Sequence, residues 1–202
     1  NSGVIVQTAD DVHVSNLYVK ILTEVESANW NDTDSAAYFP STSLSNTVVD
    51  NCQFDGQDGS NDEGPRLFSM RLYIEYSGTF NNCTGGNSAF GGAGGTASGT
   101  FTNCTGGNYS FGGGGTASGT FTNCTGGNRA LGGDGGTASG TFTNCTGGNY
   151  SFGGDGGTLS GQLYYCRLTT GSFQTLAEGG KLRACVDGSD TFIATLYYEG
   201  LG

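Results

Sequence analysis

Proline, histidine and charged residues are all scarce in this sequence. Its 202 residues include 2 prolines, 1 histidine and 1 tryptophan, and 12% of them are charged. Disordered chains are rich in charge and poor in aromatic residues, whereas 11% of these residues are aromatic, so the composition favours a packed fold. A collagen triple helix needs a high proline content and glycine at every third position, so the scarcity of proline excludes it. No stretch approaches the ~18 consecutive apolar residues of a membrane helix, so we expect no membrane insertion.

Basic residues are also few. The 7 lysines and arginines are outnumbered by 18 aspartates and glutamates, which gives a net charge of −11. A surface of this sign repels phosphates, so we expect no nucleic-acid partner. The chain begins at Asn1 rather than Met, and we expect it to be a processed chain or a piece of a longer one.

Glycine is abundant, with 39 residues, and it belongs to an internal repeat. Residues 99–119 read GTFTNCTGGNYSFGGGGTASG, and nearly the same segment returns at 119–140 and 140–161 and, more loosely, at 78–99. Five cysteines recur with the same period, at Cys83, Cys104, Cys124, Cys145 and Cys166. A fixed period of this length, about 21 residues, is typical of solenoid and other repeat architectures.

Each repeat carries three apolar positions. Threonines alternate with Phe101, and this period of two predicts a strand. The first apolar column is Phe80, Phe101, Phe121, Phe142 and Leu163. The second is Phe90, Phe111, Leu131, Phe152 and Phe173, and the third is Ala97, Ala117, Ala138 and Leu159. Stacking such coils about 4.8 Å apart buries all three columns. We therefore predict an all-β fold, a single-chain parallel β-helix (β-solenoid) with coils of about 21 residues and roughly eight coils.

An asparagine column extends the repeat toward the N-terminus. Its members are Asn16, Asn51, Asn82, Asn103, Asn123 and Asn144. Stacked asparagines can hydrogen-bond from coil to coil and tolerate the dihedrals of a tight turn. The first two separations in this column are each longer than one coil by ten or more positions, so two loops should leave the solenoid near 23–43 and 55–66.

We expect three regions in the chain. Residues 1–76 should form N-terminal coils with the two long loops, and residues 77–176 should form the regular repeats. Residues 177–202 should depart from the repeat and cap the open end, where unpaired strand edges invite aggregation.

The motif GTFTNCTGGN with its glycine-rich turns resembles the right-handed parallel β-helix of the pectin-lyase-like superfamily. The segments GQLYYCRLTTGSF (161–173) and RACVDG (183–188) resemble the terminal part of repeat-bearing β-helix proteins of environmental bacteriophages. The resemblance covers most of the chain. It implies a tail-fibre, tailspike or virion-decoration protein on a virion or extracellular surface. Glycine-rich turns and the two open ends of a solenoid favour self-association. The resemblance implies a homotrimer, and an end-to-end polymer is the alternative. An extracellular filament subunit or bacterial adhesin is an alternative.

The first predicted loop carries the candidate ligand-binding residues. Aromatic rings can stack on sugar rings, and neighbouring polar side chains can hydrogen-bond sugar hydroxyls, so a cell-surface glycan is the expected ligand. These residues are Trp30, Asn31, Asp32, Asp34, Tyr38 and Phe39. The aromatic residues could equally pin the loop to the rod or to a neighbouring subunit.

A threonine face provides the rival hypothesis of ice binding. Three TxT pairs should lie on one flat outer sheet, a pattern that resembles the ice-binding face of insect-type antifreeze solenoids. The pairs are Thr100 and Thr102, Thr120 and Thr122, and Thr141 and Thr143. Outward threonine is also simply a good strand residue.

Catalytic and metal-binding residues are not expected. His13 lies in a strand-like run and should be an exposed face residue, and the repeats at 77–161 carry few ionisable groups besides cysteine and tyrosine: Arg129, Asp134 and Asp155. A polysaccharide-degrading enzyme with paired carboxylates is conceivable only in the two loops. The cysteines are odd in number, with equivalent neighbours in the repeats, which favours free buried thiols. No zinc spacing or complete calcium loop occurs, so we expect no metal and no cofactor.

Overall fold

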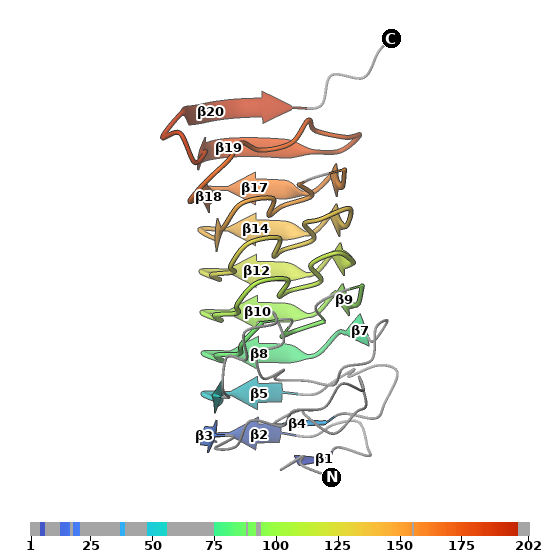
Figure 1. The fold of residues 1–202 in the computed structure, drawn as a ribbon, viewed down its shortest axis with the longest axis vertical. Coiled ribbons are helices and arrows are strands. Elements are labelled where there is room, and N and C mark those ends of the chain that lie inside the picture. Colours follow the sequence, from blue (N-terminus) through green and yellow to red (C-terminus); the bar gives the residue numbers. More distant parts are fainter. Residues whose placement is uncertain are drawn as a thin grey trace, which may run out of the picture.

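Short strands make up all the regular structure that can be described in this protein. The computed structural model describes residues 5–6, 13–16, 18–20, 37–38, 48–55, 75–87, 89–91, 94–154 and 156–197. Within these residues there are 20 strands and no helix, so none of their elements is a helix that could span a membrane. The strands stack along one axis as a parallel β-solenoid (Figure 1).

The widest wall of the solenoid is a column of parallel strands in register. Thr100 pairs with Thr120, and Phe101 with Phe121, so identical residues of successive repeats lie above one another. The column runs through β2 (His13–Ser15), β5 (Val48–Asp50), β8 (Thr79–Asn81), β10 (Thr100–Thr102), β12 (Thr120–Thr122), β14 (Thr141–Thr143), β17 (Gln162–Tyr164) and β19 (Lys181–Val186).

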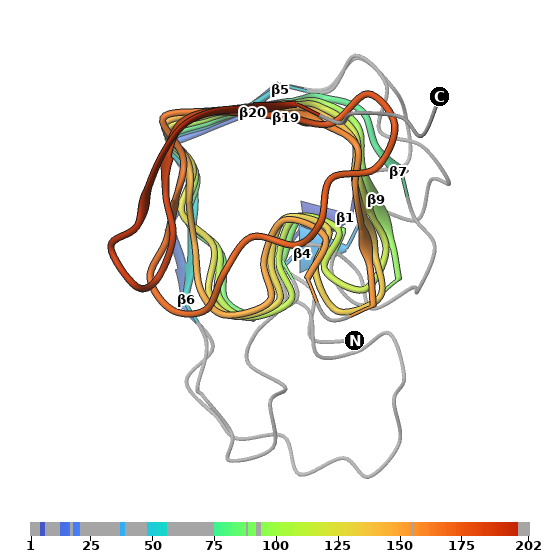
Figure 2. The same ribbon diagram turned by 90° about the horizontal axis from the view of Figure 1, so that it is seen from above.

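Two further walls complete each coil (Figure 2). One consists of β7 (Glu75–Tyr76), β9 (Thr96–Ala97), β11 (Thr116–Ala117), β13 (Thr137–Ala138) and β16 (Thr158–Leu159). The other is made of parallel bridges that link Thr84, Thr105, Thr125 and Thr146 in turn. Its regular pairs are β15 (Thr146–Gly147) with β18 (Arg167–Leu168), and β3 (Tyr18–Lys20) with β6 (Gln53–Asp55). A separate pair joins β1 (Ile5–Val6) to β4 (Ala37–Tyr38).

The number of complete coils is smaller than the sequence predicted. The widest wall has eight parallel strands, but the wall that contains β9 has only five. A coil closes only where all its walls are present, so the described residues form about five complete coils rather than roughly eight. The long spacings of the N-terminal strands account for the difference, because most residues between them lie outside the described part.

Phenylalanine rings fill the interior as predicted. Phe101, Cys104, Phe111 and Ala117 are fully buried, whereas Thr100 is exposed. Successive rings of the first column stack nearly parallel, with centroids 4.8 to 4.9 Å apart. Rings of the second column meet them edge to face, as Phe101 meets Phe111 at 5.7 Å. Both arrangements are favourable for aromatic pairs, so the ring columns keep the coil spacing uniform.

One corner of the coils, from Asn16 to Asn144, is held by the predicted asparagine ladder. Each amide Nδ2 donates to the Oδ1 of the asparagine one coil below, over 2.9 to 3.3 Å. The backbone is left-handed at every member, with φ between 52° and 55°. Asparagine tolerates this conformation better than most residues. A second ladder was not predicted: the Oδ1 of Asn87 accepts from the backbone N–H of Asn108, and the pattern continues through Asn128 and Asn149.

Glycine is required where coils touch through their backbones. At Gly119, an added Cβ would lie 2.1 Å from the carbonyl oxygen of Gly99 in the coil below. Gly140 and Gly161 make the same approach to the coils below them, at 2.3 and 2.4 Å. A Cβ cannot sit within 3.0 Å of a backbone atom unless something shifts, so this column sets how closely the coils approach.

The direction of the chain reverses after the last parallel strand. β19 continues the stack beyond residue 177, where the departure was expected, and buries Leu182 and Cys185 in the core. β20 (Phe192–Tyr197) then pairs antiparallel with β19 and is the last strand of the stack (Figure 1). Phe173 and Ile193 pack against the core near this end and are only partly buried.

Candidate functional site

The predicted glycan-binding loop lies mostly outside the described residues. Of its six candidate residues, Trp30, Asn31, Asp32, Asp34 and Phe39 fall in the part that the structure does not describe. Tyr38 lies in β4, where its Cα is paired with that of Val6 in β1. The ligand-binding assignment therefore stays a prediction.

The predicted threonine array is present on the widest wall. Its six residues are Thr100, Thr102, Thr120, Thr122, Thr141 and Thr143, paired in register across β10, β12 and β14. Thr100 and Thr120 are exposed, and the other four are half-buried. The coil spacing is close to the 4.8 Å ring stacking, and side chains two residues apart on a strand are separated by about 6.7 Å. The wall thus presents a regular two-dimensional array of hydroxyl and methyl groups.

Other side chains limit the array at both ends. Below it, the Asn81 amide donates to Asp50 Oδ1 at 2.6 Å, and His13 Nε2 lies 2.8 Å from Asp50 Oδ2. The Asn81 hydrogen bond, with a smaller contribution from His13, holds the pKa of the Asp50 carboxyl below its ordinary value. Above the array, the Tyr164 hydroxyl donates to Gln162 Oε1 at 2.6 Å. His13 is exposed on the outer face, as expected.

A cation–π stack occupies another part of the surface and was not predicted. The Arg129 guanidinium lies 5.5 Å from the ring centroid of Tyr109 and 5.7 Å from that of Tyr150, in the coils below and above. It also donates to the Tyr109 hydroxyl and lies 3.5 Å from Asp134. Both charged groups are about one-third exposed, so solvent screens the ion pair. The sequence signal for this stack is the set of triplets NYS, NRA and NYS, which occupy equivalent positions in three successive repeats.

The three residues of this stack have a left-handed backbone conformation. Tyr109, Arg129 and Tyr150 have φ values of 55°, 56° and 59°, a left-handed conformation that costs roughly 1 kcal/mol or more for residues other than glycine. The nearby chain must therefore hold them in place. Gly113 and Gly154 pack directly against the Tyr109 and Tyr150 backbones, where a Cβ would come within 2.6 Å.

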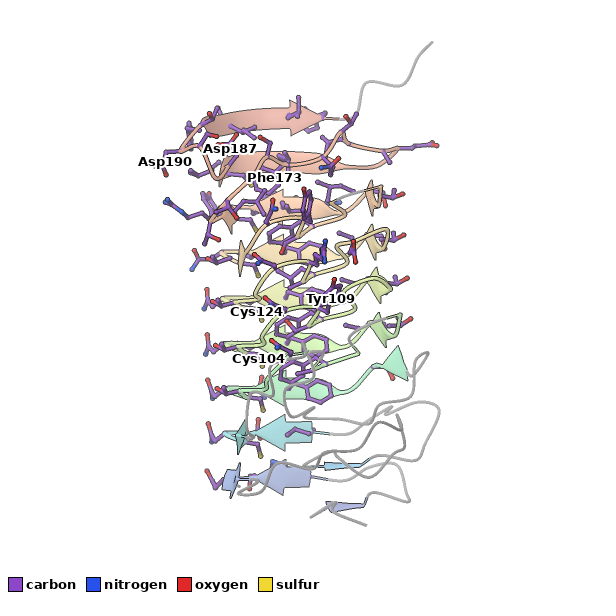
Figure 3. All side chains as sticks on the ribbon, in the orientation of Figure 1. Cys104, Tyr109, Cys124, Phe173, Asp187 and Asp190 are labelled. Carbon is purple, nitrogen blue, oxygen red and sulfur yellow. The ribbon has the colours of Figure 1, made fainter. Side chains whose placement is uncertain are left out.

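The cysteines form an internal column, as the repeat period predicted. All seven are buried, and none of them is in a disulfide: Cys52, Cys83, Cys104, Cys124, Cys145, Cys166 and Cys185. Cys104 and Cys124 are labelled in Figure 3. The Cys104 thiol lies 3.3 Å from the Phe80 carbonyl oxygen in the coil below and 3.4 Å from that of Thr102 in its own coil. Each thiol from Cys83 onward has two such carbonyl acceptors, which makes the column a structural part of the core.

Burial makes ionisation of these thiols unfavourable. It raises the pKa of Cys166, and the neighbouring thiols of Cys145 and Cys185 raise it further. The thiol of Cys104, together with burial, raises the pKa of Cys83. Cys104 and Cys145, together with burial, do the same to Cys124. A nucleophilic cysteine needs a thiolate, and burial opposes its formation at Cys83, Cys124 and Cys166.

Comparison of this chain with known proteins found no match. No family model matches the sequence, and neither the curated proteins nor the solved structures contain a match. Within the described residues, no group of three or more histidine, cysteine or acidic side chains is placed to hold a metal ion. The described residues form a parallel β-solenoid.

Proposed function

We propose that this chain is a structural or adhesive surface protein, of the virion-associated β-helix type that its repeats resemble. In this proposal it is not an enzyme; it self-associates and presents loops that bind a glycan or receptor. The stacked coils supply a stiff scaffold, because ring columns, asparagine ladders and backbone pairing all repeat at the same spacing. The location proposed is a virion or extracellular surface.

One observation carries this proposal. Val14 of β2 pairs directly with Val49 of β5, and Val49 pairs with Phe80 of β8. The ladder asparagines of these adjacent coils are separated by 35 and 31 residues, against 21 residues in a regular repeat. Each of these two coils therefore has at least ten residues more than a regular repeat, which is enough for an inserted loop. Insertions on a rigid scaffold commonly carry binding function.

The binding role is tested by Trp30→Ala. If the first insertion binds a glycan through stacking, the variant should lose at least about tenfold in affinity on a glycan array or on host cells. Tyr165→Ala, which removes an exposed aromatic side chain from a corner of the solenoid, should bind as the wild type does. A wild type that binds nothing, or a folded Trp30→Ala protein that binds equally well, would make the insertion structural. New reducing ends in a bound polysaccharide would instead support the enzyme alternative.

Ice binding is a second candidate, supported by the regular threonine array. Here we expect wild-type protein to show thermal hysteresis and to shape ice crystals, and Thr122→Tyr to abolish both effects by interrupting the flat array. Thr125→Tyr places the same ring on an adjacent wall and should leave the activity intact. No hysteresis in the wild type, or equal loss in both variants, would count against this candidate.

A further inference from the structure

The C-terminal end of the solenoid exposes a strand edge. β20 pairs antiparallel with β19, from Lys181 opposite Tyr197 to Val186 opposite Phe192, and it has no other strand partner among the described residues. Figure 1 shows it as the uppermost strand. The outer edge of such a strand offers backbone N–H and C=O groups to an incoming chain.

The side chains of β20 do nothing to block this edge. Its sequence FIATLY contains no charge, proline or glycine, and charge and proline are the usual protection of edge strands. Phe192, Leu196 and Tyr197 are 64%, 47% and 56% exposed. Aromatic and β-branched residues favour strand pairing, so β20 combines an open edge with an apolar surface.

Two copies repel each other less at this end than at the N-terminal end. Residues 161–202 contain four carboxylates (Glu178, Asp187, Asp190 and Glu199) and three cations (Arg167, Lys181 and Arg183), so their net charge is −1. Residues 1–76 contain 12 carboxylates and three cations, so their net charge is −9. Two like-charged molecules approach more easily through their less charged ends.

The remaining charges suit a two-fold arrangement. The turn before β20 carries Asp187, which is buried, and Asp190 (Figure 3). The Asp190 side chain is 77% exposed and pairs with Arg167 at 2.6 Å. At the other end of β20, the Lys181 ammonium lies 5.0 Å from the ring centroid of Tyr197, and Arg183 is exposed. In two antiparallel copies of β20, the turn with Asp190 of each copy would lie at the same end of the joint as Lys181 and Arg183 of the other.

We propose that a second copy of this chain docks on β20 about a two-fold axis, pairing β20 with β20 antiparallel. The two solenoids then join through their C-terminal ends, and their widest walls become one continuous sheet. This docking rests on the proposed function and deepens its self-association by naming the surface. Six residues pair on each side, whereas β2 at the opposite end of this wall is only three residues long.

Sedimentation velocity and light scattering on the full chain test this docking. The wild type should have twice the 20.6 kDa mass of one chain. Ala194→Lys puts a charge near the centre of the exposed strand, where the two copies meet, and should give a folded monomer. Thr105→Lys adds the same charge to an exposed residue of a side wall and should remain dimeric.

Other masses would overturn the proposal. A monomeric wild type at the highest soluble concentration, a threefold mass, or a mass that grows without limit each contradicts it, as does a dimeric Ala194→Lys. If the Ala194→Lys variant misfolds, a measurement on the wild type alone still tests the dimer. Hydrogen exchange of the backbone amides at 192–197 should slow as the protein concentration rises. An unchanged exchange rate would reject the dimer. Glycan binding that depends on Trp30 but comes from a monomer would leave the binding role standing and this inference refuted.

Discussion

Gly119→Ala is expected to be among the most destabilising single substitutions in the regular repeats. The added Cβ would lie 2.1 Å from the Gly99 carbonyl oxygen and within 3.0 Å of the Ser98 backbone. No flexible side chain can move aside there, because the obstructing atoms belong to backbone that is itself hydrogen-bonded between coils. Separating the coils would lengthen those bonds and open the ring stack, so we expect a loss of at least about 3 kcal/mol.

Gly135→Ala is the matched control for this substitution. Gly135 is also in a turn of the repeat, but a Cβ there would meet nothing within 4 Å. Its φ of 78° leaves only the cost of a left-handed alanine, about 1 kcal/mol. Urea unfolding followed by circular dichroism measures both variants. If the two lose stability equally, close approach between coils does not explain the glycine column.

Alkaline pH should unfold this protein unusually steeply. The pKa values of Cys83, Cys124 and Cys166 are raised in the folded state, whereas an unfolded cysteine titrates near about 8.5. The stabilisation is therefore fully present below about pH 8.5. It is lost as pH rises further, because the unfolded chain releases protons that the folded chain retains. Each thiol that keeps its proton in the folded state adds to this slope, by at most about 1.4 kcal/mol per pH unit.

The slope of stability against pH, rather than stability itself, is the quantity to measure. Free energies of unfolding from urea titrations between about pH 8 and pH 10 provide it. Cys124→Ala should make the slope shallower, by at most about 1.4 kcal/mol per pH unit, whatever the cavity costs at neutral pH. Thr125→Ala, one residue further and exposed, should leave it unchanged. A wild-type stability that is flat across this range would show that the buried column does not resist ionisation.

The regular part of the fold was predictable because one short pattern repeats. The alternation around Phe101 indicated a strand, the spacing of Cys104 and Cys124 indicated the coil length, and the Asn103 column indicated the corner. Each of these positions recurs in successive coils. Each predicted element therefore rests on several repeats, and a chance pattern in one repeat does not change the prediction.

Features that depend on a single coil escaped prediction. Arg129 replaces tyrosine in one repeat, and only the stacked geometry shows that it lies between two aromatic rings. The chain reversal that makes β20 antiparallel depends on the Asp187 turn, where Oδ1 accepts hydrogen bonds from the N–H groups of Ser189 and Thr191. The proposed ligand-binding residues around Trp30 have no repeat to support them, and they stay predictions.

Because successive coils are nearly identical, a mutation that deletes or duplicates one repeat would change the length of the rod by one whole coil. Removing residues 120–140 would join Gly119 to Thr141, and the new junction would read Gly-Thr, as the old ones do. Each surviving coil would meet a neighbour of the same kind as before. Similar gene segments in tandem are prone to unequal recombination, so longer and shorter relatives of this rod, differing by about 4.8 Å per unit, should arise without passing through a misfolded intermediate.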